Sequence, residues 1–425
     1  MAQSAGKAWL LGAVLLLFAL CCGCAQGPRD LARIRAPYNR AVQSTSAEQM
    51  LQNLVRLKYR ESPEFLAVTA IASQSTYNGG GSVGVTLPEA ALSVLTLGAS
   101  ASFSERPTFT FQTRDDPEFQ RGLLEPIPLQ TIALVTQTGW AADRVQRLTI
   151  KNINGVDNAT SAGGPTPQYK PEFERFQRAA YLLRELQRRR WVELAPAKHE
   201  ETLIKKQDTE FLGIPWEQVS LEEIALLKDR GYSTRPVDGF PQFAEFYRTA
   251  GDLSLRFHPL AWTTPEAMEL AHLLELQPHG DFYIIKNSTS EEGQLGRIVK
   301  QRDGDLSLQA QLLMTPRSVL EMMYYLSQAV PAPPKHINER RVTITRDEMG
   351  AVFDWNQVTA ELFQVHVCPD RPAPGVAFVA VPYEGFWYYI ANNDLASKAT
   401  FGLLQEIYNI EVRGGDQGIP FIIGS

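Results

Sequence analysis

Apolar and small polar residues alternate along the segment LSVLTLGASASFSERPTFTFQT, residues 92–113. Leu, Ala and Phe occupy most of its odd-numbered positions, and Thr, Ser and Gly occupy most of the even-numbered ones. Because successive side chains of a strand point to opposite faces, this pattern predicts strands with one apolar and one wet face. A partner strand is predicted over residues 65–77, with the turn at NGGGS, residues 78–82. No Gly-Lys-Ser/Thr follows these glycines, which excludes a P-loop.

Helical spacing of apolar residues predicts much of the remaining regular structure. The segment STSAEQMLQNLVRLKYRESP, residues 44–63, has this spacing, and Ser46 and Gln49 are placed as a capping box. The same spacing predicts helices over residues 171–190, 220–231, 264–275, 315–330 and 394–410. Two of these segments begin with Thr-Pro, at positions 264–265 and 315–316, the arrangement typical of an N-cap and a first helical residue.

Shorter apolar runs predict strands in the second half of the chain. They lie at residues 281–286, 295–302, 306–313 and 420–425, together with a hairpin that turns at Glu384-Gly385. Residues 195–215 are charged and are predicted to be irregular. The elements together predict an α+β fold in which antiparallel β-hairpins pack against several amphipathic helices.

The N-terminus has a pattern of its own. Lys7 precedes an apolar stretch over residues 9–20, and CCGC follows at residues 21–24. The stretch has the length of a signal-peptide core and is too short to span a bilayer, which needs about 20 apolar residues. An apolar core followed by Gly23-Cys24 resembles the bacterial lipoprotein signal, although Cys21 stands where leucine is usual. A metal site at CCGC is disfavoured, because no second Cys/His cluster supplies further ligands.

This interpretation divides the chain into five regions. They are a signal peptide (1–23), a polar tether (24–43), a helix and hairpin domain (44–195), a middle α+β region (196–330) and a C-terminal hairpin and helix region (331–425). Cys24 is the predicted lipidation site, carrying palmitate or a similar acyl chain. In the class that the signal resembles, Ala25 after the cysteine implies sorting to the outer membrane, facing the periplasm. Cys368 is then the single thiol of the mature chain, and no internal disulfide can form.

Composition and charge exclude some functions. The chain has 425 residues, of which 44% are hydrophobic and 21% charged, and its formal charge is −6. A mildly acidic protein without a long Lys/Arg run is a poor candidate for nucleic-acid binding. No cofactor or metal site is predicted, because the remaining histidines lack the spacing of a metal motif: His199, His258, His272, His279 and His336.

One group of residues has the composition of a nucleophilic site. His366, Cys368 and Asp370 alternate in FQVHVCPD, and a thiolate nucleophile needs a nearby base. However, side chains at i and i+2 of a strand pass beside one another, and a lone cysteine is most often a small buried hydrophobe. The aromatic residues around Glu384 are interpreted as cross-strand pairs and core in preference to a stacking platform: Tyr383, Phe386, Trp387, Tyr388 and Tyr389.

The alternating strands at 65–113 allow another interpretation. An apolar face opposite a Ser/Thr/Gly face is also the pattern of a membrane hairpin. A single hairpin could cross a bilayer only within an oligomer, because open strand edges cannot lie in lipid. A sheet with one face packed on a helical layer is the commoner arrangement.

Several segments resemble, as a set, a group of bacterial predicted lipoproteins without established function: EQMLQNLVRLKYRESPEFL, ERPTFTFQT, LLEPIPLQTIALVTQTGW, LTIKNINGVDN and GFWYYIANNDLASKATFGLLQEIYNI. The resemblance runs through much of the mature chain, so it implies one architecture in the cell envelope. It supplies no catalytic or binding residue.

Three functions follow from these observations, in order of preference. The first is a lipid-anchored envelope protein with a structural or adaptor role, whose partners are the membrane, other envelope proteins or copies of itself. The second is a subunit of an oligomeric outer-membrane translocation or export channel that contributes the 65–113 hairpin. The third is a periplasmic enzyme that uses Cys368 and His366.

Overall fold

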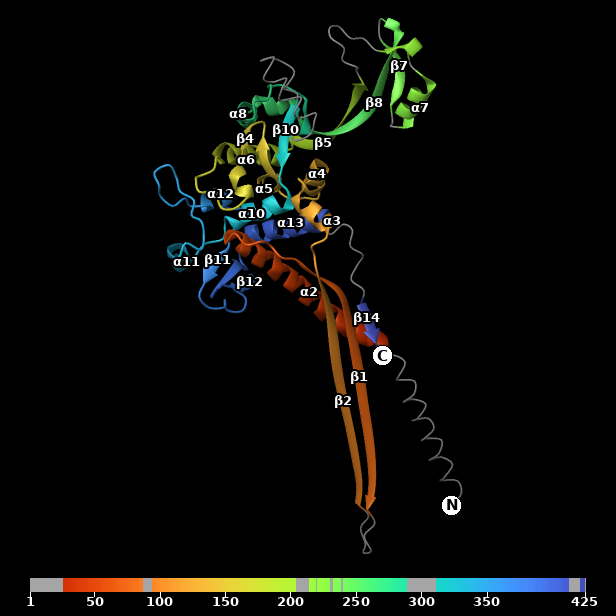
Figure 1. The fold of residues 1–425 in the computed structure, drawn as a ribbon, viewed down its shortest axis with the longest axis vertical. Coiled ribbons are helices and arrows are strands. Elements are labelled where there is room, and N and C mark those ends of the chain that lie inside the picture. The colour runs from red at the N-terminus through yellow and green to blue at the C-terminus, as the bar shows by residue number, and fades with distance from the viewer. Residues whose placement is uncertain are drawn as a thin grey trace.

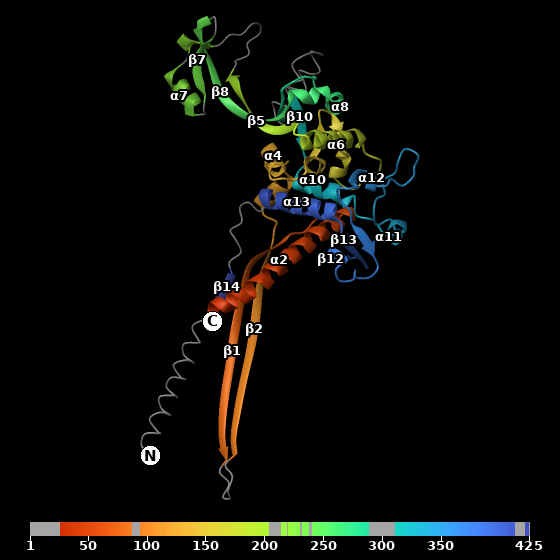
Figure 2. The same ribbon diagram turned by 180° about the vertical axis from the view of Figure 1, so that it is seen from behind.

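The structure is a computed structural model that describes residues 26–86, 94–203, 214–218, 220–229, 232–237, 240–288, 311–412 and 421–424. A body of helices and sheets lies between two ribbons that project from it in opposite directions (Figure 1, Figure 2). One ribbon is the long hairpin of β1 (Leu66–Thr86) and β2 (Val94–Thr113). The predicted α+β class, with antiparallel hairpins and several helices, is confirmed.

The second ribbon, which we call the arm, extends from the far end of the body. It consists of β5 (Val192–Leu203) and β8 (Phe240–Phe257) in antiparallel pairing, with β6 (Ile214–Pro215), β7 (Ser233–Val237) and α7 (Leu221–Asp229). Residues 195–203 were expected to be irregular, and the structure corrects this. These residues form a strand because their backbone pairs with β8, and their charged sequence gave no apolar alternation from which this pairing could be predicted.

The strands form three sheets. The first has the order β14-β1-β2, where β14 (Phe421–Gly424) runs parallel to β1. The second has the order β4-β3-β10-β9-β8-β5 and contains β3 (Ile150–Ile153), β4 (Val156–Asp157), β9 (Phe282–Asn287) and β10 (Gln311–Pro316). The third has the order β11-β13-β12 and contains β11 (His366–Cys368), β12 (Ala377–Tyr383) and β13 (Phe386–Ala391).

Helices make up most of the body (Figure 1). The longest is α2 (Gln26–Lys58), and the others in the body are α3 (Pro117–Leu124), α4 (Leu129–Gln137), α5 (Ala142–Thr149), α6 (Glu174–Arg188), α8 (Pro265–Leu273), α10 (Val319–Ser327), α11 (Pro334–Asn338), α12 (Asn356–Thr359) and α13 (Leu395–Glu411). Short 3₁₀ turns lie at Thr160–Gly163, Trp216–Gln218 and Pro259–Thr263.

One hydrophobic core joins these elements. It contains Leu51 and Leu54 of α2, Leu183 of α6, Met322 of α10 and Leu404 of α13, all buried. The core therefore draws residues from all three regions that the sequence separated at positions 195 and 330. Burial of so much apolar surface is the main favourable term that holds the body together.

Arg317 is the largest fully buried side chain of the described residues. Its guanidinium donates hydrogen bonds to the backbone oxygens of Arg147 and Ile150, at 3.0 Å each, and to that of Asn158. It also lies over the ring of Tyr325, 4.1 Å from the centroid. These acceptors replace the water that a buried guanidinium loses, and the desolvation lowers the pKa of Arg317 to about 10.

Helix α2 is longer than the sequence predicts. We expected a helix from residue 44, preceded by a polar tether, whereas the helix begins at Gln26 and contains Pro37. Apolar periodicity could not reveal the first half, because most of residues 35–46 are exposed and this half packs no continuous apolar face. At ~1.5 Å per residue its 33 residues span about 50 Å.

Strand β1 continues through the segment NGGGS, where we predicted a turn. The pairing runs without interruption from Ala70↔Thr110 to Thr86↔Val94, so residues 78–82 are in the strand. Glycine populates extended as well as turn conformations, and twenty residues of β2 supply a partner for every position. The predicted turn at residues 78–82 is therefore wrong, and residues 87–93, which connect the two strands in the sequence, lie outside the described part of the chain.

Other predicted boundaries divide into confirmed and corrected ones. The turn at Glu384-Gly385 and the helix after Asp394 are confirmed. Thr315-Pro316 does not begin a helix, because both residues lie in β10, and α10 is capped by Ser318 with Glu321 in a capping box. The strand predicted at 295–302 lies outside the described residues.

Candidate functional site

The β1–β2 hairpin is the first candidate site. The register of its two strands places apolar residues on one face and small polar residues on the other. Directly opposite residues of an antiparallel pair lie on the same face. From residue 75 outward, one face carries the pairs Tyr77↔Phe103, Gly79↔Ala101, Gly81↔Ala99, Val83↔Leu97 and Val85↔Leu95. The other face carries Thr76↔Ser104, Asn78↔Ser102, Gly80↔Ser100, Ser82↔Gly98 and Gly84↔Thr96. The first is the apolar face of the hairpin, and the second is its polar face.

We call residues 75–86 and 94–105 the sorted segment, because their apolar and polar positions lie on separate faces. Charged residues lie at both ends of this segment. Between positions 75 and 104 the sequence has one charge, Glu89, which lies between the two strands. Glu105 and Arg106 stand at the end nearer the body, opposite Ser75 and Gln74. The aromatic pair Tyr77↔Phe103 follows directly on the apolar face. Aromatic residues between charged and apolar positions are typical of a strand at a membrane interface.

The length of the sorted segment matches a bilayer. Residues 75–86 and 94–105 give twelve paired positions in each strand. At ~3.3 Å per residue they extend for about 40 Å, and a strand that crosses a membrane at a tilt of about 45° needs about 9–11 residues. The segment is therefore long enough to cross the hydrocarbon core once in each direction.

Near the body, α2 contacts the apolar face of the hairpin, where Phe109 stays 43% exposed. The rings of Tyr38 and Phe109 lie 5.9 Å apart, and Phe109 pairs with Ile71, which is buried. The N-terminal end of α2 lies beside β1 at the level of β14, which pairs with residues 71–74 (Figure 1, Figure 2). Cys24, the predicted lipidation site, lies outside the described residues, but α2 starts two positions after it. The helix thus begins on the apolar side, at the level where the sorted segment starts.

Beyond residue 74 the two strands have no layer packed against them among the described residues (Figure 1). The outer edge of β2 has no strand partner in the described part of the chain, so its alternate N–H and C=O groups are free to pair. A two-stranded hairpin without a third strand or a helical layer is marginally stable in water. This segment therefore needs a further surface, either lipid, other strands or both.

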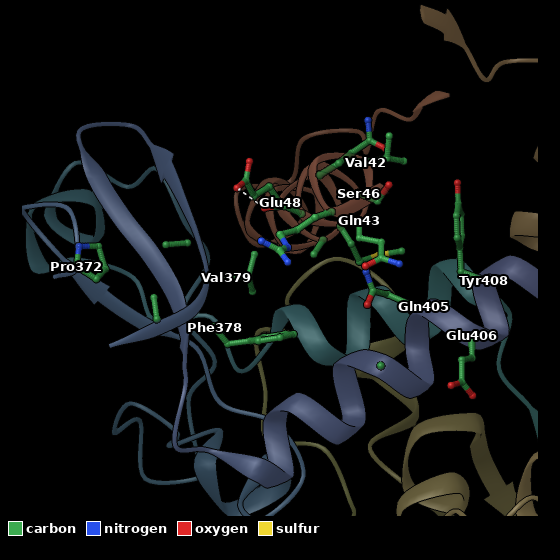
Figure 3. Close-up of a pocket in the computed structure, with 18 of the residues that line it drawn as sticks. Val42, Gln43, Ser46, Glu48, Pro372, Phe378, Val379, Gln405, Glu406 and Tyr408 are labelled. Carbon is green, nitrogen blue, oxygen red and sulfur yellow. Dashed lines mark hydrogen bonds between the residues drawn. The ribbon is translucent and has the colours of Figure 1, made fainter. Parts of the chain in front are cut away.

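A groove lies beside the root of the hairpin (Figure 3). It has a volume of about 1140 Å³, and its walls come from α2, β12 and α13. Glu48 of α2 accepts a hydrogen bond from Ser44 at 3.3 Å, and Phe378 of β12 is 45% exposed. The lining combines both charge signs with apolar patches, and the Ser44–Glu48 contact is an exposed hydrogen bond between residues four apart on one helix. It has the chemistry of a contact surface more than that of a catalytic site.

The predicted nucleophilic group does not form a catalytic arrangement. His366 and Cys368 lie on β11, and the ring of His366 stacks on Tyr389 at 5.2 Å. The thiol of Cys368 contacts the backbone oxygen of Asp370 at 3.0 Å. Burial raises the pKa of the Cys368 thiol, and the nearby Asp370 carboxylate adds to this. A raised pKa keeps the thiol protonated, whereas a nucleophile needs the thiolate.

Cys368 is therefore expected to react slowly with iodoacetamide in the native protein at neutral pH. Its labelling should be followed by mass spectrometry and compared with labelling in denaturant, where the thiol regains an ordinary pKa. Fast native labelling that is lost in His366→Ala would contradict this and return the pair to consideration as a catalytic site.

The aromatic residues around the 384–385 turn form cross-strand pairs, as predicted, but only Tyr388 is in the core, and the other four are partly buried. Tyr388 is fully buried, and its hydroxyl lies 2.7 Å from that of Tyr59 at the end of α2. The Tyr59 hydroxyl also lies 2.6 Å from Nδ1 of His336, which is buried. These contacts tie α2, α11 and β13 together and leave no exposed stacking platform at Tyr388.

The described residues show neither a metal-ligand cluster nor a membrane-spanning helix. Within the described ranges, no group of three or more His, Cys, Asp or Glu residues could hold a metal ion. Among the described helices, none combines the length and the apolarity needed to cross a membrane. The chain matches no family model, no curated protein and no solved structure.

Proposed function

We propose that the chain is a subunit of an oligomeric membrane channel, and that each copy contributes its β1–β2 hairpin to the bilayer-spanning part. The observation that carries this proposal is the register of residues 75–86 with residues 94–105, which separates apolar from polar positions over a bilayer-spanning length. In this arrangement the apolar face contacts lipid and the polar face lines a water-filled interior.

Oligomerisation supplies what a single hairpin lacks. Every backbone N–H and C=O group within lipid needs a partner, and one copy leaves its outer strand edges open. A ring of copies pairs the β2 edge of one copy with the hairpin of the next, so that all edges are closed. The bodies then gather on one side of the membrane, with the arms directed away from it.

The lipid anchor fits the same arrangement. We propose that Cys24 is acylated and holds the protein at the periplasmic face of the outer membrane. Helix α2 packs on the apolar side of the hairpin through Tyr38 and Phe109. An acyl chain attached two residues before α2 would therefore enter the bilayer on the lipid-facing side of the ring, at the level where the sorted segment begins.

The proposal predicts conductance from the purified protein. Full-length protein extracted in detergent is expected to produce discrete current steps in a planar bilayer and to show ring-shaped particles by electron microscopy. The matched control replaces residues 75–105 with an Asn-Gly turn. None of the described core residues lies in that range, so the body should stay folded while the current disappears. Monodisperse single copies without current from the unmodified protein would contradict the channel.

An adaptor role is the second candidate, and the arm is the observation that favours it. The arm exposes several apolar side chains at the end of the molecule farthest from the hairpin: Trp216, Leu221, Leu226 and Phe240. If the adaptor function is the correct one, Cys24→Ala yields a soluble protein that stays monodisperse without detergent. The channel predicts instead that this form aggregates unless residues 75–105 are removed.

A further inference from the structure

A second pocket lies on the body, away from the hairpin, and it contains an unpaired buried cation. It has a volume of about 430 Å³ and lies between the C-terminal end of α2, the segment after α10, the loop before α12 and strands β11 and β13. Lys58, the last residue of α2, lines it and is 6% exposed. We call it the Lys58 pocket.

Lys58 has no hydrogen bond or ion pair with any described residue. Lysine is almost never this buried unless a partner compensates its charge. Burial lowers the pKa of Lys58 to about 8, with no charged group contributing. This value is still above neutral pH, so most of the molecules carry an ammonium ion at this position that no described residue neutralises.

The rest of the pocket is complementary to a small molecule with an apolar body. Val330, Val365, Phe353 and Trp355 are buried and line its walls. The Trp355 indole donates to Thr345 at 3.0 Å, so this polar group of the wall is already satisfied. The side-chain oxygen of Gln328 is buried, lines the same pocket and has no hydrogen-bond partner. The pocket thus combines one unpaired cation with mostly apolar inner walls, and it has further polar groups in its lining: Asp354, Asn356, Gln364 and His366.

We propose that the Lys58 pocket binds a small organic carboxylate, with the carboxylate paired to the Lys58 ammonium and the apolar part against Phe353 and Trp355. A single ammonium matches the single charge of a carboxylate, and apolar walls match a hydrocarbon body. A phosphate dianion is disfavoured, because one ammonium does not balance two negative charges and the Asp354 carboxylate also lines the pocket. The site is independent of the proposed channel, because the pocket contains no residue of the hairpin.

The test uses full-length protein in detergent and benzoate as the probe, measured by calorimetry and thermal unfolding. Benzoate is expected to bind and to raise the melting temperature, while benzamide, which has the same shape without the charge, has no effect. Lys58→Met should weaken benzoate binding by roughly 30-fold or more, because truncation removes one partner of a buried charge pair. Lys335→Met is the matched control, since Lys335 is exposed and lies outside the pocket.

A measurement on the unmodified protein guards against a variant that does not fold. Acetylation of Lys58 by acetic anhydride, followed by mass spectrometry, should slow when benzoate is present, while acetylation of Lys335 should not. Equal binding of benzoate and benzamide, unchanged binding in Lys58→Met, or binding of inorganic phosphate in place of benzoate would each overturn the proposal. So would the absence of benzoate binding and protection up to tens of millimolar.

Discussion

Replacing Ala99 with arginine is expected to abolish membrane insertion, whereas replacing its neighbour Ser100 with arginine is expected to permit it. The two positions lie near the middle of the sorted segment, Ala99 opposite Gly81 on the apolar face and Ser100 opposite Gly80 on the polar face. Arginine on the lipid face near the bilayer midplane costs about 2–4 kcal/mol per strand, while substitutions toward the interior mainly alter selectivity. In an oligomer the cost is incurred by every copy.

The experiment compares the two variants in the same bilayer assay. Ala99→Arg should give no current steps, and Ser100→Arg should give steps with a shifted anion preference, because each copy adds a positive charge to the interior. Both substitutions introduce the same side chain. A loss of current in Ala99→Arg alone is therefore caused by the face on which the arginine lies and not by its size. Similar behaviour of the two variants would mean that the register does not separate a lipid face from an interior face.

Arg317→Met is expected to destabilise the body by about 3–5 kcal/mol, the largest effect of any single substitution considered. The methionine fills part of the volume but removes several charge-assisted hydrogen bonds and leaves the backbone oxygen of Asn158 buried without a donor among the described residues, while the oxygens of Arg147 and Ile150 keep only the side-chain amide of Asn158. Each buried acceptor left unpaired costs about 1–3 kcal/mol. Arg317→Lys should recover part of this loss, since it keeps a charge and three donors but not the planar geometry that reaches several oxygens.

The control for this prediction is Arg178→Met on the surface. Arg178 donates two hydrogen bonds of 2.6 Å to Glu269. The distances alone would suggest a strong ion pair. Both side chains are exposed, 49% and 40%, so water screens the pair and its removal should lower the free energy of unfolding far less than Arg317→Met does. Chemical unfolding, followed by circular dichroism, measures both variants. A smaller loss for Arg317→Met than for Arg178→Met would contradict the structural role given to the buried guanidinium.

The sequence by itself determined the properties that depend on local pattern. The alternation of apolar and polar residues between Leu95 and Phe111 identified β2. Successive side chains of a strand point to opposite faces, so a strand with one wet face shows this alternation whatever covers its other face. Capping and helical spacing located α8 and α13, and the glycine at position 385 located the last hairpin. The α+β class follows from these elements together.

The tertiary structure decided what depends on partners distant in the chain. Strand β1 passes through three glycines because β2 pairs with it along its whole length, and no local signal could report this. The first half of α2 lacks an apolar stripe and was taken for a tether. Lys58 follows Leu51, Leu54 and Val55 at helical spacing, which is compatible with burial, yet only the fold shows that no described residue pairs with its charge. Local patterns fix secondary structure, whereas uncompensated charge and open strand edges become visible only once the surroundings of a residue are known.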